Sequence, residues 1–201
     1  MNFLLCTDRK HPCWPHLEKF ADTWGFVLTS TVDALAGGEN LFLVSCTQFV
    51  DRGIRNRFKH VFVLHESDLP KGRGWSPLAW QILEGKNRIP VTLIEAADEI
   101  DAGKIIATAT IELDGTELAP EIARKAAEAK IGLIKAALCY ELHPRDQVGD
   151  ATFYPRRRPE DSRLDPHKTI AEQFDLLRIC EPRFPAFFDY RGCRYTVEVR
   201  K

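Results

Sequence analysis

The sequence predicts an α/β fold, with a Rossmann-like parallel sheet, helices on both faces of that sheet, and a short C-terminal helix plus β-hairpin. Two observations support this prediction. Short apolar runs recur along the chain and alternate with helical stretches; they cover residues 3–6, 26–31, 41–46 and 61–64. Such runs are typical of strands that are buried on both faces of a parallel sheet. Near residue 147 the chain becomes basic and rich in proline, so we expect a Rossmann-like domain over 1–146 and a C-terminal extension over 147–201.

The remaining elements follow from periodicity. A helix is expected near 16–24, a further strand over 91–94, and an extended strand with one solvent-facing side from 106 to 113. Apolar residues near helical spacing predict a long helix that opens around 116–119 and ends where Pro144 stops it. The extension should form a helix from about 167 to 178, then a hairpin that turns at Arg191 and Gly192.

Composition excludes several classes of function. The formal charge of the 201-residue chain is -1, which argues against a nucleic-acid partner. No apolar run approaches the roughly 20 residues that cross a bilayer, and the first residues turn polar too soon for a secretion signal, so we expect a cytoplasmic protein without membrane contact. The six cysteines include no Cys-x-x-Cys pair, which favours reduced, buried thiols, and we predict no metal site. Glycine-rich dinucleotide and P-loop motifs are absent.

The most informative stretch follows the apolar run 61–64. His65 should lie at the carboxyl end of that strand, where open α/β sheets bind their ligands. Pro70, Gly72 and Gly74 then predict a loop, and a helix begins near Pro77. A single histidine after a strand is more often structural than catalytic, so its neighbours must decide its role.

Those neighbours resemble a known family. His65, Ser67, Leu69, Pro70, Arg73, Gly74 and Pro77 stand at the matching positions of a segment found in the formyltransferases that use N10-formyltetrahydrofolate. A second segment, 90–106, is similar to the strand and loop that carry the catalytic aspartate of that family, which would be Asp101. The resemblance implies the formyltransferase fold, N10-formyltetrahydrofolate as co-substrate, and His65 and Asp101 as catalytic residues. It also implies a folate-binding loop, formed by Glu95, Ala96, Ala97 and Asp98.

The extension carries a second resemblance. Residues 153–165 and 184–197 are similar to segments of the sugar-nucleotide N-formyltransferases, with the short enzymes of pseudaminic-acid biosynthesis as the nearest subgroup. This implies a nucleotide-linked amino sugar as substrate, plausibly a UDP-linked 4-amino-4,6-dideoxy-N-acetyl hexose, and by family habit a homodimer. A tRNA substrate is disfavoured by the short tail and the charge balance. The predicted substrate-binding residues are Ser67, Lys71, Arg73, Trp75, Tyr154, Arg156 and Arg157.

One position departs from the family pattern. The family asparagine lies two residues before the histidine, where this chain has Val63. Backbone N–H groups of the loop, or Ser45, Thr47 and Gln48 after the neighbouring strand, are candidates to hold the developing oxyanion instead. Two alternatives stay open: a metal-dependent amide hydrolase that uses His65, Asp68 and Asp101, and a non-catalytic homologue that binds folate or a nucleotide.

Overall fold

A computed structural model describes residues 1–141 and 143–201 and places six strands in one sheet. The strand order is β2-β1-β3-β4-β6-β7. The first four strands are parallel, as predicted, whereas β6 runs antiparallel to β4 and β7 runs antiparallel to β6. The bounds are β1 (Asn2–Leu5), β2 (Phe26–Thr29), β3 (Gly38–Val44), β4 (Phe58–His65), β6 (Arg88–Glu95) and β7 (Ile105–Glu112).

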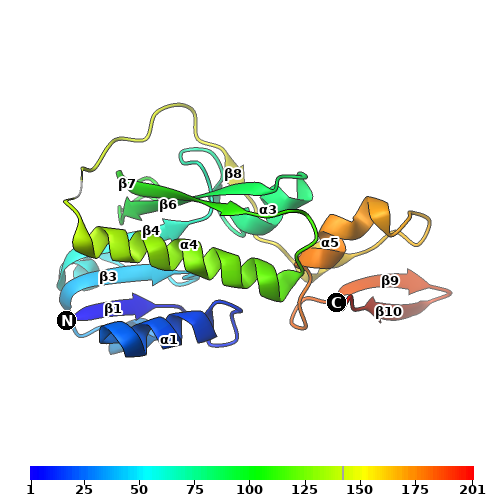
Figure 1. The fold of residues 1–201 in the computed structure, drawn as a ribbon, viewed down its shortest axis with the longest axis horizontal. Helices are drawn as coiled ribbons and strands as arrows, with labels where there is room; N and C mark the ends of the chain where they lie inside the picture. The colour runs from blue at the N-terminus through cyan, green and yellow to red at the C-terminus, as the bar shows by residue number, and fades with distance from the viewer. Residues whose placement is uncertain (142) are drawn as a thin grey trace.

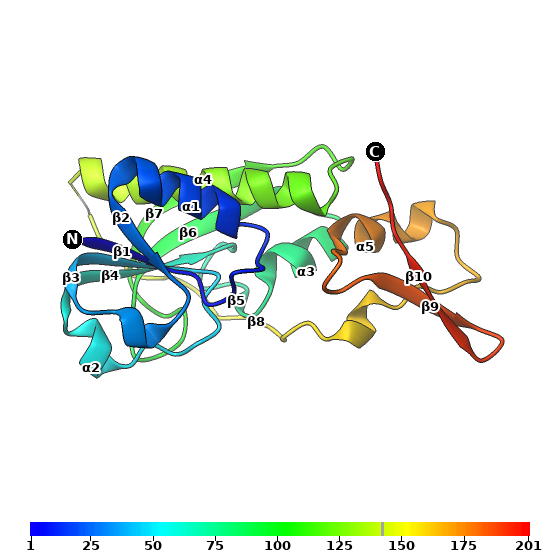
Figure 2. The same ribbon diagram turned by 90° about the horizontal axis from the view of Figure 1, so that it is seen from below.

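Helices cover both faces of the sheet, which confirms the predicted layers. Helices α1 (Trp14–Trp24) and α4 (Ala119–Cys139) lie side by side on one face (Figure 2), where they bury the larger apolar cluster. The opposite face is covered by two short elements, α2 (Arg52–Arg55) and the 3-10 helix η1 (Val32–Ala34), over a smaller cluster that contains Leu35 and Val50. Within the described ranges, no helix is long and apolar enough to cross a membrane.

The extension contains the predicted helix and hairpin. After the 3-10 helices η2 (Pro159–Ser162) and η3 (Ala171–Gln173) come α5 (Phe174–Ile179), β9 (Ala186–Tyr190) and β10 (Cys193–Val197). The hairpin turns at Arg191 and Gly192, as predicted, but α5 is shorter than the predicted helix. A short strand, β8 (Phe153–Tyr154), also pairs in parallel with β5 (Arg73–Gly74) in the loop after His65.

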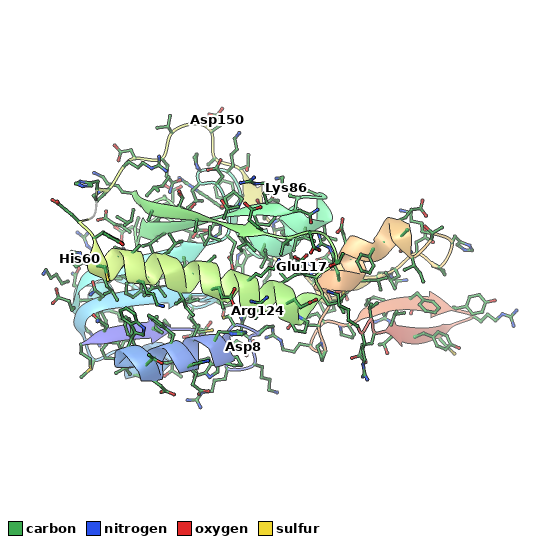
Figure 3. The ribbon with its side chains drawn as sticks, in the orientation of Figure 1. Asp8, His60, Lys86, Glu117, Arg124 and Asp150 are labelled. Atoms are coloured by element: carbon green, nitrogen blue, oxygen red, sulfur yellow. The ribbon has the colours of Figure 1, made fainter. Side chains whose placement is uncertain are left out.

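The arrangement of the elements brings the extension to one end of the sheet. Strands β1 and β3 point toward α5 and the hairpin (Figure 1), so the loops that follow them meet the C-terminal segment. Asp8, in the loop after β1, pairs with Arg183 (Figure 3 labels Asp8). Arg178 of α5 is buried and donates to the Asn87 side chain at 2.9 Å. Many contacts therefore cross residue 146, and the division into two domains stays a prediction.

Candidate active site

A cleft of about 580 Å³ opens where the parallel strands end. Its walls come from the loops after β1, β3, β4 and β6, from the first half of α4, and from residues 156–158 of the extension. The crevice beyond the carboxyl ends of the strands is the usual ligand site of an open α/β sheet. The cleft thus lies where the sequence predicted a binding site.

His65 and Asp101 meet at this cleft, as expected from the sequence. His65 ends β4, is only 6% exposed, and donates from Nε2 to the Gly72 carbonyl at 2.7 Å. Its Nδ1 lies 3.6 Å from Asp101 Oδ2, and that oxygen also accepts from the Gly74 N–H at 2.9 Å. Because Nε2 is engaged with a carbonyl, Nδ1 is the nitrogen that remains for a ligand. An imidazole that donates from both nitrogens is an imidazolium, whose charge the Asp101 carboxylate would stabilise.

The Asp101 loop (96–104) must fold back to reach His65. Strand β6 is antiparallel to β4, and its last residue, Glu95, pairs with Phe62 rather than with His65. The loop returns along the sheet and closes where the Glu95 N–H donates to the Lys104 carbonyl at 2.9 Å. Asp101 itself has a φ of 54°, in the left-handed region that few non-glycine residues adopt. A conformation of this kind persists only when neighbouring contacts hold it.

Those contacts come from Gln147 and Arg73. The Gln147 side-chain amide donates to the carbonyls of Asp101 and Gly103, at 2.8 Å each. Its oxygen accepts from the Arg73 guanidinium at 2.9 Å, and the same guanidinium donates to Glu99 at 2.8 Å. Arg73 is buried and does not line the cleft, so we interpret it as a residue that positions the Asp101 loop rather than as the substrate contact predicted from the sequence.

Gly103 makes the loop closure sensitive to a single methyl group. A Cβ at this position would lie 1.7 Å from the Glu95 carbonyl oxygen. This oxygen belongs to the backbone, so it cannot move aside as the end of a flexible side chain could. We expect Gly103→Ala to open the loop, to displace Asp101 and to lower kcat about 100-fold, with a loss of about 1–3 kcal/mol in the free energy of unfolding. Steady-state kinetics and urea unfolding measure the two effects.

The matched control is Gly132→Ala in α4, where a Cβ meets no atom within 4 Å. This variant should keep its activity and gain about 0.4–1 kcal/mol of stability. Equal kinetics for the two variants would contradict the role of the loop closure.

Of the other predicted site residues, some line the cleft and others do not. Five of them line the cleft: Ala96, Ala97, Trp75, Arg156 and Arg157. Glu95, Asp98, Ser67, Lys71, Arg73 and Tyr154 lie outside its lining. Asp98 pairs with Arg55. Burial, together with the hydrogen bond that the Tyr154 hydroxyl donates to Glu84 at 2.8 Å, raises the pKa of Tyr154 to about 12. The binding roles predicted for these six residues stay predictions.

Val63, which stands where the family has asparagine, also has apolar neighbours in the structure. Val63 lines the cleft and packs with Leu69, Ile94 and Ile105. Of the predicted substitutes, Ser45, Thr47 and Gln48 all line the cleft. Ser45 accepts from Lys130 at 3.2 Å, and Thr47 hydrogen-bonds to Thr7 at 2.9 Å. Asp68 is exposed and outside the cleft lining, so the three ligands of the metal-dependent hydrolase alternative are not assembled among the described residues.

A buried ion pair in the cleft wall was missed by the sequence reasoning. Lys130 of α4 pairs with Glu66, the residue after His65, and only 1% of the Lys130 side chain is exposed. Burial opposes the charge on Glu66, but the Lys130 ammonium outweighs it and holds the pKa of Glu66 below its ordinary value. Burial likewise opposes the charge on Lys130, and Glu66 raises the pKa of Lys130 in return. Both groups thus stay charged beside His65. One feature of the sequence could have indicated this pair: Lys130 lies four residues after Ala126, so it falls on the apolar stripe of the helix, where a lysine is expected to be buried.

Comparison with known proteins identifies the family. Residues 30–138, more than half of the chain, match the family described as Formyl transferase. The chain belongs to the formyl transferase family. It is therefore a formyltransferase with the formyltransferase fold, as the sequence predicted, and the predicted co-substrate N10-formyltetrahydrofolate agrees with this membership.

Solved structures, two formyltransferases among them, share the fold across almost the whole chain. A methionyl-tRNA formyltransferase from Clostridium thermocellum is 25% identical, with a TM-score of 0.85 over 99% of this chain and 92% of that one. A 4-N formyltransferase from Francisella tularensis is 18% identical, with a TM-score of 0.74 over 98% and 96%. HypX from Aquifex aeolicus, solved in complex with tetrahydrofolic acid, is 16% identical, with a TM-score of 0.73; the match covers 98% of this chain and 37% of HypX.

Proposed function

We propose that this formyltransferase moves the formyl group of N10-formyltetrahydrofolate to the primary amine of a nucleotide-linked amino sugar, with a UDP-linked 4-amino-4,6-dideoxy-N-acetyl hexose of pseudaminic-acid biosynthesis as the specific candidate. The observation that carries the proposal is one cleft that holds His65 and Asp101 together with Trp75 and Arg156. A 4-N formyltransferase is among the proteins of similar fold. The choice of sugar and nucleotide rests on the resemblance of the extension to sugar-nucleotide enzymes.

The pair His65 and Asp101 supplies what amine formylation needs. The amine nitrogen attacks the formyl carbon, a C–N bond forms, and the carbonyl electron pair moves to oxygen. In the proposed mechanism, Nδ1–H of His65 donates to that oxyanion, and the Asp101 carboxylate takes the proton that the amine loses. The bond to N10 then breaks as N10 receives the proton that Asp101 took from the amine, which leaves the formamide and tetrahydrofolate and returns Asp101 to its carboxylate form. The 3.6 Å gap between Nδ1 and Oδ2 allows both groups to reach one reaction centre.

The basic segment of the extension supports an anionic substrate. Arg156, Arg157 and Arg158 all line the cleft. The Arg156 guanidinium lies 4.8 Å from the centre of the Trp75 ring, and this cation–π contact orients the exposed side chain. Guanidinium groups match the geometry of phosphate oxygens, and an aromatic ring offers a stacking face for a base. A nucleoside diphosphate at this wall would present its sugar to His65.

The decisive experiment is a transfer assay. The protein is incubated with N10-formyltetrahydrofolate and a panel of amino-sugar nucleotides, and each product is examined by mass spectrometry for the gain of one formyl group. We expect the gain on a UDP-linked 4-amino sugar and none with His65→Asn. If folate binds but no panel member is formylated by the wild-type protein, the non-catalytic alternative replaces this proposal.

A second candidate substrate is methionyl-tRNA, because a methionyl-tRNA formyltransferase has a TM-score of 0.85 with this chain. The net charge of -1 counts against it, since tRNA binding depends on phosphate contacts and weakens steeply with salt. Charged initiator tRNA therefore belongs in the panel, at low and at physiological salt. The homodimer and the cytoplasmic location stay predictions.

A further inference from the structure

A compact group of sulfur and imidazole ligands lies in the wall of the cleft, apart from His65 and Asp101. Cys6 follows β1, and His11 and Cys13 lie in the loop that leads to α1. One ligand atom from each residue lies within 4.8 Å of the others. Cys6 and Cys13 are at most 1% exposed, and His11 and Cys13 line the cleft. No step of the proposed formyl transfer uses these side chains.

The distances fit a tetrahedral metal ion. Zn–S bonds of about 2.3 Å place two tetrahedral sulfur ligands about 3.8 Å apart, and Cys6 Sγ lies 4.0 Å from Cys13 Sγ. His11 Nδ1 lies 2.8 Å from Cys13 Sγ, so a small rotation of the half-exposed imidazole would seat an ion between them. The Cys13 N–H also donates to Nδ1 at 3.2 Å, so Nδ1 carries its lone pair, and a bound ion would take the place of this hydrogen bond.

The loop that carries the ligands is fixed by its backbone. The Cys6 N–H donates to the Thr29 carbonyl at 3.0 Å, which ties the end of β1 to β2. The His11 N–H donates to the Asp8 carbonyl at 3.0 Å, and the Trp14 N–H donates to the His11 carbonyl at 2.8 Å. A cluster held in this way would lose little freedom on binding an ion, which favours affinity.

The charges around the cluster also balance. Two thiolates would neutralise a divalent cation. The Lys130 ammonium acts electrostatically on both thiols and donates to Ser45, which also accepts from Cys13 Sγ, but its charge is paired with Glu66. Thiolate and imidazole are the ligands that select zinc over magnesium or calcium.

We propose that Cys6, His11 and Cys13 form a binding site for one Zn²⁺ ion in the wall of the catalytic cleft. Three protein ligands leave the fourth position open to water or to a ligand in the cleft. Because His11 and Cys13 line the cleft whereas Cys6 is fully buried, the cleft is the side from which water or a ligand would reach the ion. The proposal is independent of the formyl acceptor, since it concerns residues outside the His65–Asp101 pair.

Cobalt titration tests the site without any activity measurement. Metal-free, reduced, full-length protein is titrated with Co²⁺, and zinc affinity is measured by competition with a chromophoric chelator. We expect one Co²⁺ per chain, with sulfur-to-cobalt charge-transfer absorption in the near ultraviolet and tetrahedral bands in the visible. Cys13→Ser and His11→Gln should each weaken Zn²⁺ binding at least about 100-fold.

The matched control is Cys46→Ser. Cys46 also lines the cleft, but its Sγ donates to the Gln48 carbonyl at 3.2 Å and it is not part of the cluster. Its affinity should equal that of the wild-type protein. His11→Gln changes a half-exposed loop side chain, so it keeps the test valid if circular dichroism shows that Cys13→Ser does not fold. Absence of the charge-transfer absorption, or equal affinity for wild type and His11→Gln, would overturn the proposal.

Discussion

Replacement of His65 by asparagine should lower kcat for formyl transfer by about 10²- to 10³-fold, the range found when one oxyanion donor is removed. In the proposed mechanism Nδ1–H of His65 donates to the oxyanion while Nε2 is bound to the Gly72 carbonyl, and an asparagine cannot make both contacts from the two ring-nitrogen positions. KM for the amine substrate should change little, because the cleft wall formed by Trp75 and Arg156 is unaltered. Steady-state kinetics at several donor concentrations separate the two effects.

Two further variants sharpen this prediction. Asp101→Asn keeps the size of the side chain but removes the proton acceptor, so kcat should fall by a similar factor. His60→Asn is the control: His60 (labelled in Figure 3) lies on the same strand, is exposed, and does not line the cleft. The assigned roles fail if either active-site variant keeps full kcat, or if His60→Asn loses as much.

The largest expected effect on stability comes from the buried pair of Lys130 and Glu66. Lys130→Met removes one partner and leaves a carboxylate in a wall where only 14% of the Glu66 side chain is exposed. Such a change costs about 3–5 kcal/mol in the free energy of unfolding, because the remaining charge is buried without its partner. Urea unfolding followed by circular dichroism measures it. Arg124→Ala, which breaks an exposed ion pair with Glu128 on the same helix, should cost no more than about 0.5 kcal/mol.

The pair of Lys130 and Glu66 also predicts the acid limb, that is, how the free energy of unfolding falls at low pH. The pKa of Glu66 is lower in the folded protein than its ordinary value of 4.5. Its contribution is therefore present above pH 4.5 and is lost as the pH falls through the folded pKa. In Glu66→Gln this part of the acid limb should disappear. An acid limb identical to that of the wild-type protein would show that Glu66 does not titrate with a lowered pKa.

Much of the fold could be predicted because strand and helix periods are local properties. The parallel strands β1 to β4 were found from apolar runs, and the hairpin from the turn at Arg191 and Gly192. The direction of β6 was not, because a run buried on both faces reads the same whether the strand is parallel or antiparallel. The pairing of β5 with β8 joins residues that are 80 positions apart in the sequence, so no local pattern predicts it.

For the site, the family motifs identified His65 and Asp101 but could not show which neighbours face the cleft. The motif placed Arg73 beside the catalytic residues, and only the three-dimensional contacts reveal that its guanidinium is already engaged with Glu99 and Gln147. The sulfur cluster was missed for a related reason. Cys6 and Cys13 are seven residues apart and contact each other only because the intervening loop folds back on itself.

The reach of Gln147 has a consequence for how the molecule is built. His65 lies at the end of a strand, but Asp101 keeps its left-handed backbone conformation because the side-chain amide of Gln147, in the extension, donates to its carbonyl. The boundary predicted at residue 146 marks a change in composition, but residues on both sides of it build the same site. An exchange or truncation of the extension would therefore also change the distance between His65 and Asp101. Natural variation in the extension is thus a route by which the geometry of this pair could be altered.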